Sequence, residues 1–122
     1  MMKRGRRRLF RDYTPRYSGT HPTSVTIDSE SFDIDSWRDI LLKTCQLVLD
    51  RNPSDFPKVL LLKGSSRPWF SRDPDDLRDP IKVEGTDIFA ETNHNANQLV
   101  LHSLHVLKLF GLEPKIDIGS EK

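Results

Sequence analysis

The sequence predicts an α+β fold, in which a small antiparallel or mixed sheet carries about three helices on one face. Two segments have apolar residues at three- and four-residue spacing, and short segments of alternating apolar and polar residues surround them. Neighbouring strand segments are joined by only a few residues, which favours hairpins. The predicted order of elements is β-β-α-α-β-β-α-β, and the chain of 122 residues is expected to form one domain.

The charge distribution divides the chain into a basic arm and a mildly acidic body. Residues 1–17 carry seven basic side chains and one acidic one, whereas the rest of the chain carries twelve basic and seventeen acidic side chains. Prolines and a glycine towards the end of the arm oppose helix formation. We expect a flexible N-terminal arm over residues 1–22, a single folded domain over residues 23–118 and a frayed C-terminus over residues 119–122.

The folded part is expected to begin with a β-hairpin followed by a helix. Apolar residues alternate with polar ones on both sides of a polar turn, at Val25, Ile27, Phe32 and Ile34. Ser36 is a suitable N-cap for the helix, and Asp39 is placed to reach back to it. The buried stripe comprises Trp37, Ile40, Leu41, Thr44, Cys45 and Val48. Pro53 ends the helix, because the residue before a proline disfavours helical backbone.

A shorter second helix is expected to start at Ser54 and to end before Gly64, because apolar residues again recur at helical spacing. Three prolines between residues 65 and 80 exclude a long element there. Asp73 and Pro74 suit a single helical turn, with the aspartate as N-cap and the proline at the first helical position.

The last helix is the most strongly periodic element. Its apolar face comprises Ala96, Leu99, Val100, Ser103, Leu104, Leu107 and Phe110. Asn93 and Asn95 are both suitable N-caps, and Gly111 follows the last turn as a stop signal. Two short strands are expected on either side of Gly85, and residues 115–118 alternate as a final strand.

Two polar segments form a candidate binding corner. The irregular stretch around Trp69 holds apolar side chains that are hard to bury, with arginines beside them. The Asn-rich start of the last helix offers unpaired amides that suit an anion. Arginine binds phosphate, tryptophan stacks on a base, and asparagine pairs with adenine. If the two segments meet in space, the nucleic-acid-binding residues are Arg67, Trp69, Arg72, Asn93, Asn95 and Asn97.

The basic arm is a second candidate contact region. Its arginines can displace counterions from phosphate, which gives affinity without sequence preference. The residues concerned are Arg4, Arg6, Arg7, Arg8 and Arg11. The alternative is that the arm is a solvated leader or a linker from a longer parent.

Structural interpretations stay open for both the corner and the histidines of the last helix. In the structural interpretation of the corner, Trp69 and Phe70 fill the core, the asparagines only cap the helix and form the turn, and the arginines pair with the aspartates of residues 73–79. His102 and His105 have a spacing that can share a metal, but no further ligand cluster is visible. Solvent-facing histidines are therefore the favoured interpretation, and we expect no metal and no cofactor.

Catalytic patterns are weak. Glu113 and Lys115 match one half of the PD-(D/E)xK nuclease pattern, and Asp75 matches the other half only from an expected helical turn. No Ser/His/Asp or Cys/His grouping and no phosphate-binding glycine loop is recognisable. The single cysteine, Cys45, falls among apolar helix residues, which favours a buried structural thiol over a nucleophile. We name no catalytic residue.

Three segments resemble a known type of module: R-P-W-F-S at 67–71, D-P-D-D-L-R-D-P at 73–80 and G-T-D-I-F-A-E-T-N-H-N-A-N at 85–97. They are similar to a small domain at the C-terminal ends of bacterial and archaeal restriction and phage-defence proteins. The resemblance covers roughly residues 20–118 and leaves the arm outside. It implies an accessory domain that binds DNA or a partner protein, and it implies no catalytic residues.

The leading expectation is a small, non-enzymatic module that binds DNA or RNA. The alternative is a protein–protein interaction or oligomerisation domain, in which Trp69, Phe70 and the aromatic residues of the arm make a hydrophobic contact. A nuclease-related domain is a remote third hypothesis. No apolar run suits a membrane helix or a signal peptide, so we expect a cytoplasmic protein without a membrane partner.

Overall fold

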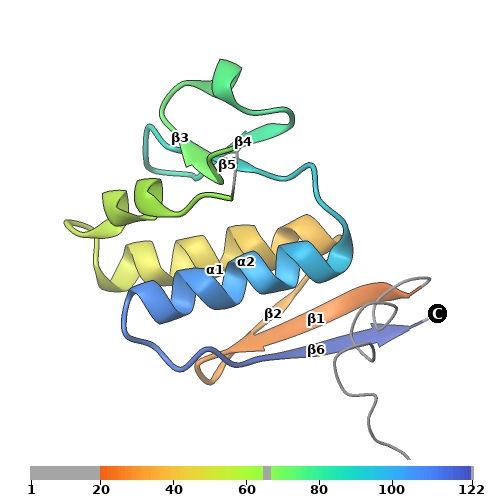
Figure 1. The fold of residues 1–122 in the computed structure, drawn as a ribbon. Coiled ribbons are helices and arrows are strands. Elements are labelled where there is room, and N and C mark those ends of the chain that lie inside the picture. The colour runs from red at the N-terminus through yellow and green to blue at the C-terminus, as the bar shows by residue number, and fades with distance from the viewer. Residues whose placement is uncertain (1–19, 65–66, 122) are drawn as a thin grey trace, which may run out of the picture.

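The computed structural model describes residues 20–64 and 67–121, which form two three-stranded antiparallel sheets with a layer of helices between them (Figure 1). The α+β class is confirmed, but the expectation of one sheet is wrong. The first sheet has the order β2-β1-β6 and the second has the order β3-β5-β4. The elements are β1 (His21–Ile27), β2 (Glu30–Asp33), α1 (Trp37–Arg51), η2 (Phe56–Leu61), β3 (Phe70–Ser71), η3 (Pro74–Asp76), β4 (Pro80–Lys82), β5 (Phe89–Glu91), α2 (Ala96–Leu109) and β6 (Ile116–Glu121).

The first sheet is built on the predicted hairpin of β1 and β2. Asp28 and Ser29 have φ of 49° and 71°, the left-handed backbone that a tight two-residue hairpin turn requires. Val25 lies opposite Phe32 on one side and Ile118 on the other, so the three apolar side chains share the face that packs on the helices. The alternation seen in the sequence therefore sets the inner face of this sheet.

The first sheet extends beyond the boundaries expected for the folded domain. β6 continues to Glu121, which pairs with His21 at the start of β1. Residues 119–121 are therefore part of a strand rather than a frayed end, and β1 starts inside the range expected for the arm. Here β1 and β6 supply each other with backbone hydrogen-bond partners. The alternation of apolar residues in the sequence ends before these pairs, so it does not predict them.

The helix α1 follows the prediction closely. Ile40, Leu41, Thr44, Cys45 and Val48 are buried against α2 and the first sheet. Burial raises the pKa of the Cys45 thiol to about 12, so it stays protonated as a structural residue does. Ser36 is the N-cap residue but makes no capping bond with its side chain. Asp39 Oδ2 accepts instead from the amide of Asp35, at 3.2 Å.

The second predicted α-helix is wrong in type. Residues Phe56–Leu61 form a 3-10 helix whose N-cap is Asp55 rather than Ser54. The bond from the amide of Leu62 to the carbonyl of Val59, at 3.0 Å, shows its three-residue repeat. Phe56 and Val59 are buried, and with this repeat they lie on one side of the element. An apolar spacing of three residues cannot by itself distinguish the two helix types.

The second sheet packs on the opposite side of the helix layer and includes a strand that the sequence pattern did not predict. β3 contains Phe70, which is buried and pairs with Ala90 of β5. The predicted helical turn is present as η3, and Asp73 Oδ1 accepts from the amide of Asp75 at 2.9 Å. This small sheet holds the residue 67–72 segment against the helices, which fixes the position of Trp69.

The helix α2 has Asn95 as its N-cap, which decides between the two candidates. Asn95 Oδ1 accepts from the amide of Gln98 at 2.9 Å, and Gln98 Oε1 accepts from the amide of Asn95 at 3.1 Å. Gly111, with φ of 75°, ends the helix as predicted. Between residues 20 and 121, leaving aside 65 and 66, the structure contains no helix long and apolar enough to cross a membrane.

Candidate binding pocket

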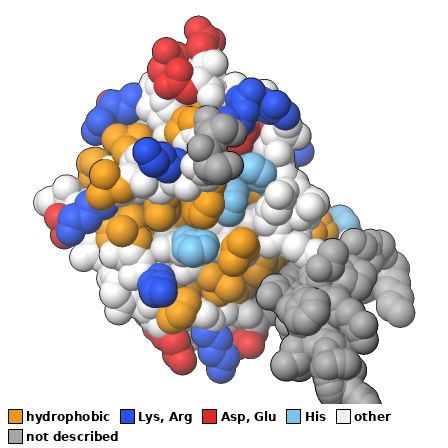
Figure 2. Space-filling view, in the orientation of Figure 1, with side chains coloured by type: hydrophobic (Ala, Val, Ile, Leu, Met, Phe, Trp, Pro, Cys, Tyr) orange, Lys and Arg blue, Asp and Glu red, His pale blue; other side chains and the backbone are white. Residues whose placement is uncertain are grey.

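A pocket of about 550 Å³ opens where the segment before β3, the end of β5 and the first turns of α2 meet. Figure 2 shows histidine side chains gathered on this face among apolar side chains, with Lys and Arg side chains close by. We call this the histidine pocket. It is lined by Gly64, Arg67, Pro68, Trp69, Arg78, Glu91, Asn93, His94, Gln98 and His102.

Aromatic rings form one wall of the histidine pocket. The ring of Trp69 is stacked on that of His102, with centroids 3.7 Å apart and an angle of 14° between the planes. His94 meets His102 edge-on at 4.5 Å, and His105 meets Trp69 edge-on at 5.4 Å. Three of these four residues come from α2 or the turn before it, so the tryptophan is held against the helix by its own stacking partners.

The two histidines that line the pocket are held in the neutral form. Only 6% of the surface of His102 is exposed, and burial lowers its pKa to about 4, with His94 and His105 adding to the effect. Burial also lowers the pKa of His94, although Glu91 and Gln98 oppose this shift. The expectation of solvent-facing histidines is wrong for His102, because Trp69 covers it, whereas His105 is exposed.

Two ring nitrogens of the pocket have no hydrogen-bond partner. Across the described residues, neither His94 Nε2 nor His102 Nδ1 has one, and both atoms are shielded from solvent. A buried polar atom left unpaired costs about 1–3 kcal/mol. Native proteins keep few such atoms, and an ordered water, local strain or a functional role accounts for those that they keep. The pocket therefore contains polar groups that the fold itself does not use.

Glu91 is a buried carboxylate that organises the floor of the pocket. Its Oε2 accepts from the amide of Arg78 at 2.7 Å, and its Oε1 accepts from the amides of Asp79 at 2.8 Å and Asn93 at 3.3 Å. Burial alone would raise the pKa of Glu91, but these three amides and the nearby His94 hold it below its ordinary value. The ionised side chain therefore ties the chain after η3 to the end of β5.

The pocket carries two arginines that no described acidic side chain neutralises. Within the part of the chain that the structure describes, Arg67 and Arg78 have no ion-pair partner. Arg72 differs from both, because its Nε donates to Asp87 Oδ2 at 3.1 Å and it does not line the pocket. The structural interpretation of the corner expected the arginines to pair with the aspartates of residues 73–79. Arg72 does pair with an aspartate, but its partner is Asp87. Arg67 has no such partner among the described residues.

No family model, no curated protein and no solved structure matches this chain.

Of the residues proposed from the sequence, the fold brings Arg67, Trp69 and Asn93 together in the histidine pocket. Asn95 is engaged in capping α2, and Asn97 lies half-buried on that helix without lining the pocket. The arm residues Arg4, Arg6, Arg7, Arg8 and Arg11 lie outside the described residues.

Sequence reasoning placed Glu91 and His94 in the polar group at the start of the last helix without naming them as binding residues, and it assigned no binding role to Arg78, Gln98 or His102. His94 lies in the turn before α2 and His102 lies within the helix, so helical spacing does not relate the two, and their ring contact is visible only in the fold.

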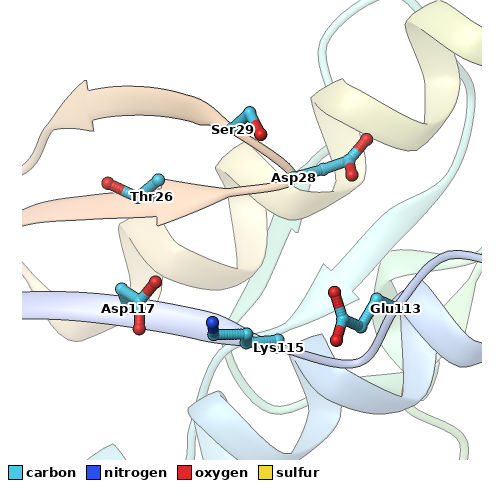
Figure 3. A pocket seen from close by; sticks show the side chains of 6 residues that line it. All are labelled: Thr26, Asp28, Ser29, Glu113, Lys115 and Asp117. Carbon is cyan, nitrogen blue, oxygen red and sulfur yellow. The ribbon is translucent and has the colours of Figure 1, made fainter.

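A smaller, polar hollow lies on the other side of the helix layer. Figure 3 shows that its lining comes from the β1–β2 hairpin, from the start of β6 and from the chain that leads into it. Its volume is about 190 Å³, and it is lined by Thr26, Asp28, Ser29, Glu113, Lys115 and Asp117. Asp28 forms an ion pair with Arg51.

The nuclease hypothesis needs Asp75 beside Glu113, and the fold separates them. Asp75 lies in η3, next to the second sheet, whereas Glu113 lies between α2 and β6 on the other side of the helices (Figure 1). Residues 20–64 and 67–121 contain no group of three or more His, Cys, Asp or Glu side chains arranged to hold a metal ion. The two halves of the sequence pattern are therefore not one site.

Proposed function

We propose that this protein is a non-enzymatic module that binds nucleic acid, with the histidine pocket as its contact site on the folded body. The observation that carries the proposal is the placement of Arg67 and Arg78, whose guanidinium groups have no ion-pair partner among the described residues, in one pocket with Trp69. Guanidinium groups bind phosphate through paired N–H donors, and an aromatic ring offers a face to a base.

The size and the wall of the pocket favour a single strand over a duplex. Its volume of about 550 Å³ lies within the range of about 300–1,000 Å³ that is usual for small-molecule sites, which suits one nucleotide unit. Reading a duplex instead requires a helix or strand that projects into a groove. A concave pocket lined by rings is better matched to bases that are already unstacked.

The charge distribution of the sequence supports a role for the arm in this proposal. The chain after residue 17 carries twelve basic and seventeen acidic side chains, so the body as a whole repels phosphate. The seven basic side chains of residues 1–17 supply the attraction that brings a strand to the body.

A cytoplasmic location, which the lone Cys45 favours, stays a prediction.

One observation favours the alternative of a protein-interaction domain. Among the described residues, the exposed large apolar side chains are Leu61 and Leu101, which are 73% and 49% exposed, and a partner protein would cover such side chains. Neither residue lines the histidine pocket. The two functions can therefore be tested with different variants.

The test is fluorescence anisotropy with labelled single-stranded and double-stranded DNA and RNA over a salt series. We expect the full chain to bind single strands, with an affinity that falls steeply as salt rises. Replacing Arg67 and Arg78 with alanine should weaken binding by about tenfold or more, since two phosphate contacts are lost.

The matched control is Arg38→Ala, which removes an exposed arginine of α1 that does not line the pocket. Replacing the five arm arginines at residues 4, 6, 7, 8 and 11 with alanine should reduce the salt dependence. If the full chain binds none of these nucleic acids at low salt, the proposal fails, and a concentration-dependent mass that Leu101→Ser abolishes would favour the alternative.

A further inference from the structure

We infer that a second copy of this chain pairs with β6 along the open edge of the first sheet. The two β6 strands run antiparallel with Ile118 opposite Ile118, so that two three-stranded sheets join into one. This inference does not depend on the proposed function. It is carried by the length of the edge, by the direction of its backbone groups and by the charges that one register brings together.

β6 lies at the border of the first sheet, whose strand order is β2-β1-β6 (Figure 1). Among the described residues β6 pairs with β1 alone, so its other side has no strand beside it. β6 has six residues and no proline, whereas the edge strands β2, β3 and β4 have four, two and three residues, and β4 begins with Pro80. Short strands and proline protect an edge from pairing, and β6 has neither protection.

Alternate residues of β6 direct their backbone groups to the open edge. The carbonyl of Gly119 accepts from Thr23 Oγ1 at 3.2 Å and therefore faces β1. The carbonyl of Thr23 accepts from the amide of Ile34 at 3.1 Å, which shows the same alternation from the β2 side. Neighbouring residues of an antiparallel strand point their N–H and C=O groups to opposite sides. The residues that face the open edge are therefore Ile116, Ile118 and Ser120.

The apolar side chains of β6 are incompletely covered. Ile116 and Ile118 are half-buried, although the residues opposite them in β1, Ile27 and Val25, are fully buried. A second β6 at the edge places Ile118 against Ile118 of the other copy and covers apolar surface that the helices leave open. The two-fold axis stands perpendicular to the sheet, so both helix layers lie on one face of the joined sheet.

The charged residues of the strand select one register. With Ile118 opposite Ile118, Lys115 of each copy lies opposite Glu121 of the other, and no like charges face each other. In the two nearest registers that keep the open backbone groups paired, Asp117 lies opposite Asp117 or opposite Glu121. Like charges in these positions destabilise a sheet. Of these three registers, the first is the one in which the sequence is complementary to itself.

The experiment is sedimentation velocity of the full chain over about 2–300 µM. Two six-residue edges bury less surface than a standard interface of about 1,600 Å², so we expect a dimer that dissociates on dilution in the micromolar range. The measured mass should rise from 14.1 kDa, which is one chain, towards twice that value as the concentration increases.

The deciding variants reverse the charges at the ends of the paired segment. Lys115→Glu places a glutamate opposite Glu121 of the other copy, twice in each dimer, and should raise the dissociation constant about fivefold or more. Adding Glu121→Lys restores opposite charges and should return the constant to within about twofold of the parent. Both positions are exposed, so neither change should affect folding. Lys108→Glu is the matched control, because it changes the net charge equally at an exposed position on α2.

A second pair of variants tests the backbone. Ser120→Pro removes an N–H group that faces the open edge, where a proline is compatible with the pairing to β1. It should weaken the dimer, whereas Ser120→Ala keeps the N–H group and should not. Circular dichroism of each variant checks that the fold is retained.

A full chain that keeps the mass of one chain up to about 300 µM would overturn the inference, as it would if another segment of the same chain covered the edge. A dimer that Leu101→Ser disrupts and Lys115→Glu does not would also overturn it, because the contact would then lie on the helices. Equal dissociation constants for Lys115→Glu and the double variant would exclude the register. These results leave the proposed function untouched, since anisotropy with nucleic acid tests it separately.

Discussion

The ring of Trp69 lies flat against the ring of His102, with 3.7 Å between the centroids. Trp69 stands just before β3 in the second sheet, and His102 stands in the middle of α2, so this contact joins two parts of the fold that are far apart in the sequence. It buries a titratable group that the helix pattern alone would leave at the surface. The histidine pocket exists because of this contact.

Removing the indole ring of Trp69 should lower the stability of the fold and raise the pKa of His102. Trp69→Ala should lower the free energy of unfolding by about 2–4 kcal/mol, because a half-buried aromatic ring and its stacking partner lose their contact. The pKa of His102 should rise from about 4 towards its ordinary value, because water regains access to the ring. NMR titration of the imidazole protons measures this, and Trp69→Phe should shift the pKa less. An unchanged pKa in the alanine variant would contradict the burial argument.

Stability should depend on pH through His102. Its pKa is about 4 in the folded protein and about 6.5 when unfolded, so the unfolded state binds more protons between these values. The stability of the folded protein that depends on a neutral His102 is fully present above about pH 6.5 and is lost as the pH falls towards 4. Urea midpoints measured across this range should fall with pH, and the fall should be smaller in His102→Phe. Parallel curves for both proteins would count against the assignment.

Glu91→Gln should be strongly destabilising although the change is nearly isosteric. The carboxylate accepts from three backbone amides, whereas the neutral amide of glutamine has one oxygen and brings two N–H donors towards other donors. A loss of about 2–4 kcal/mol in unfolding free energy is expected, measured by chemical denaturation. Glu113→Gln is the matched control, because Glu113 is exposed and should change stability by less than about 0.5 kcal/mol.

Two neighbouring asparagines should separate stability from binding. Asn95→Ala removes the cap of α2, including the bond to the Gln98 amide at 2.9 Å, and should cost about 1 kcal/mol. Asn93→Ala, at an exposed position, should leave the melting temperature close to that of the parent and weaken nucleic-acid binding. Thermal melts and anisotropy on the same samples check both outcomes. A loss of stability in Asn93→Ala together with a loss of binding alone in Asn95→Ala would contradict this assignment.

Gly111→Ala should destabilise through the backbone alone. Gly111 has φ of 75°, and an added Cβ would meet no atom within 4 Å, so no clash contributes. The left-handed conformation costs an alanine about 1 kcal/mol. Gly111→Asn should cost less, because asparagine tolerates this region better. Denaturation midpoints that order the three proteins as glycine, asparagine and alanine would confirm this; a stability of Gly111→Ala equal to that of the parent would contradict it.

Local features of this protein could be read from the sequence because they depend on neighbours in the chain. The buried stripe of α1, the turn at Asp73, the glycine after α2 and the alternation around Val25 are all of this kind. Each follows from a helix or strand period, or from the backbone preference of one residue. The sequence offered two asparagines as N-cap of α2, and the reciprocal hydrogen bonds between Asn95 and Gln98 identify Asn95 as the N-cap.

Tertiary structure decided everything that depends on contacts between distant segments. It divided the strands into two sheets, because pairing partners are selected by the packing of the helices and not by strand pattern. It buried His102 by placing Trp69 over it, and it put Arg78 at the pocket through the amide that Glu91 accepts. Composition and spacing thus determined the class, the local elements and part of the candidate residue set, whereas long-range packing determined which side chains share a pocket and what their protonation states are.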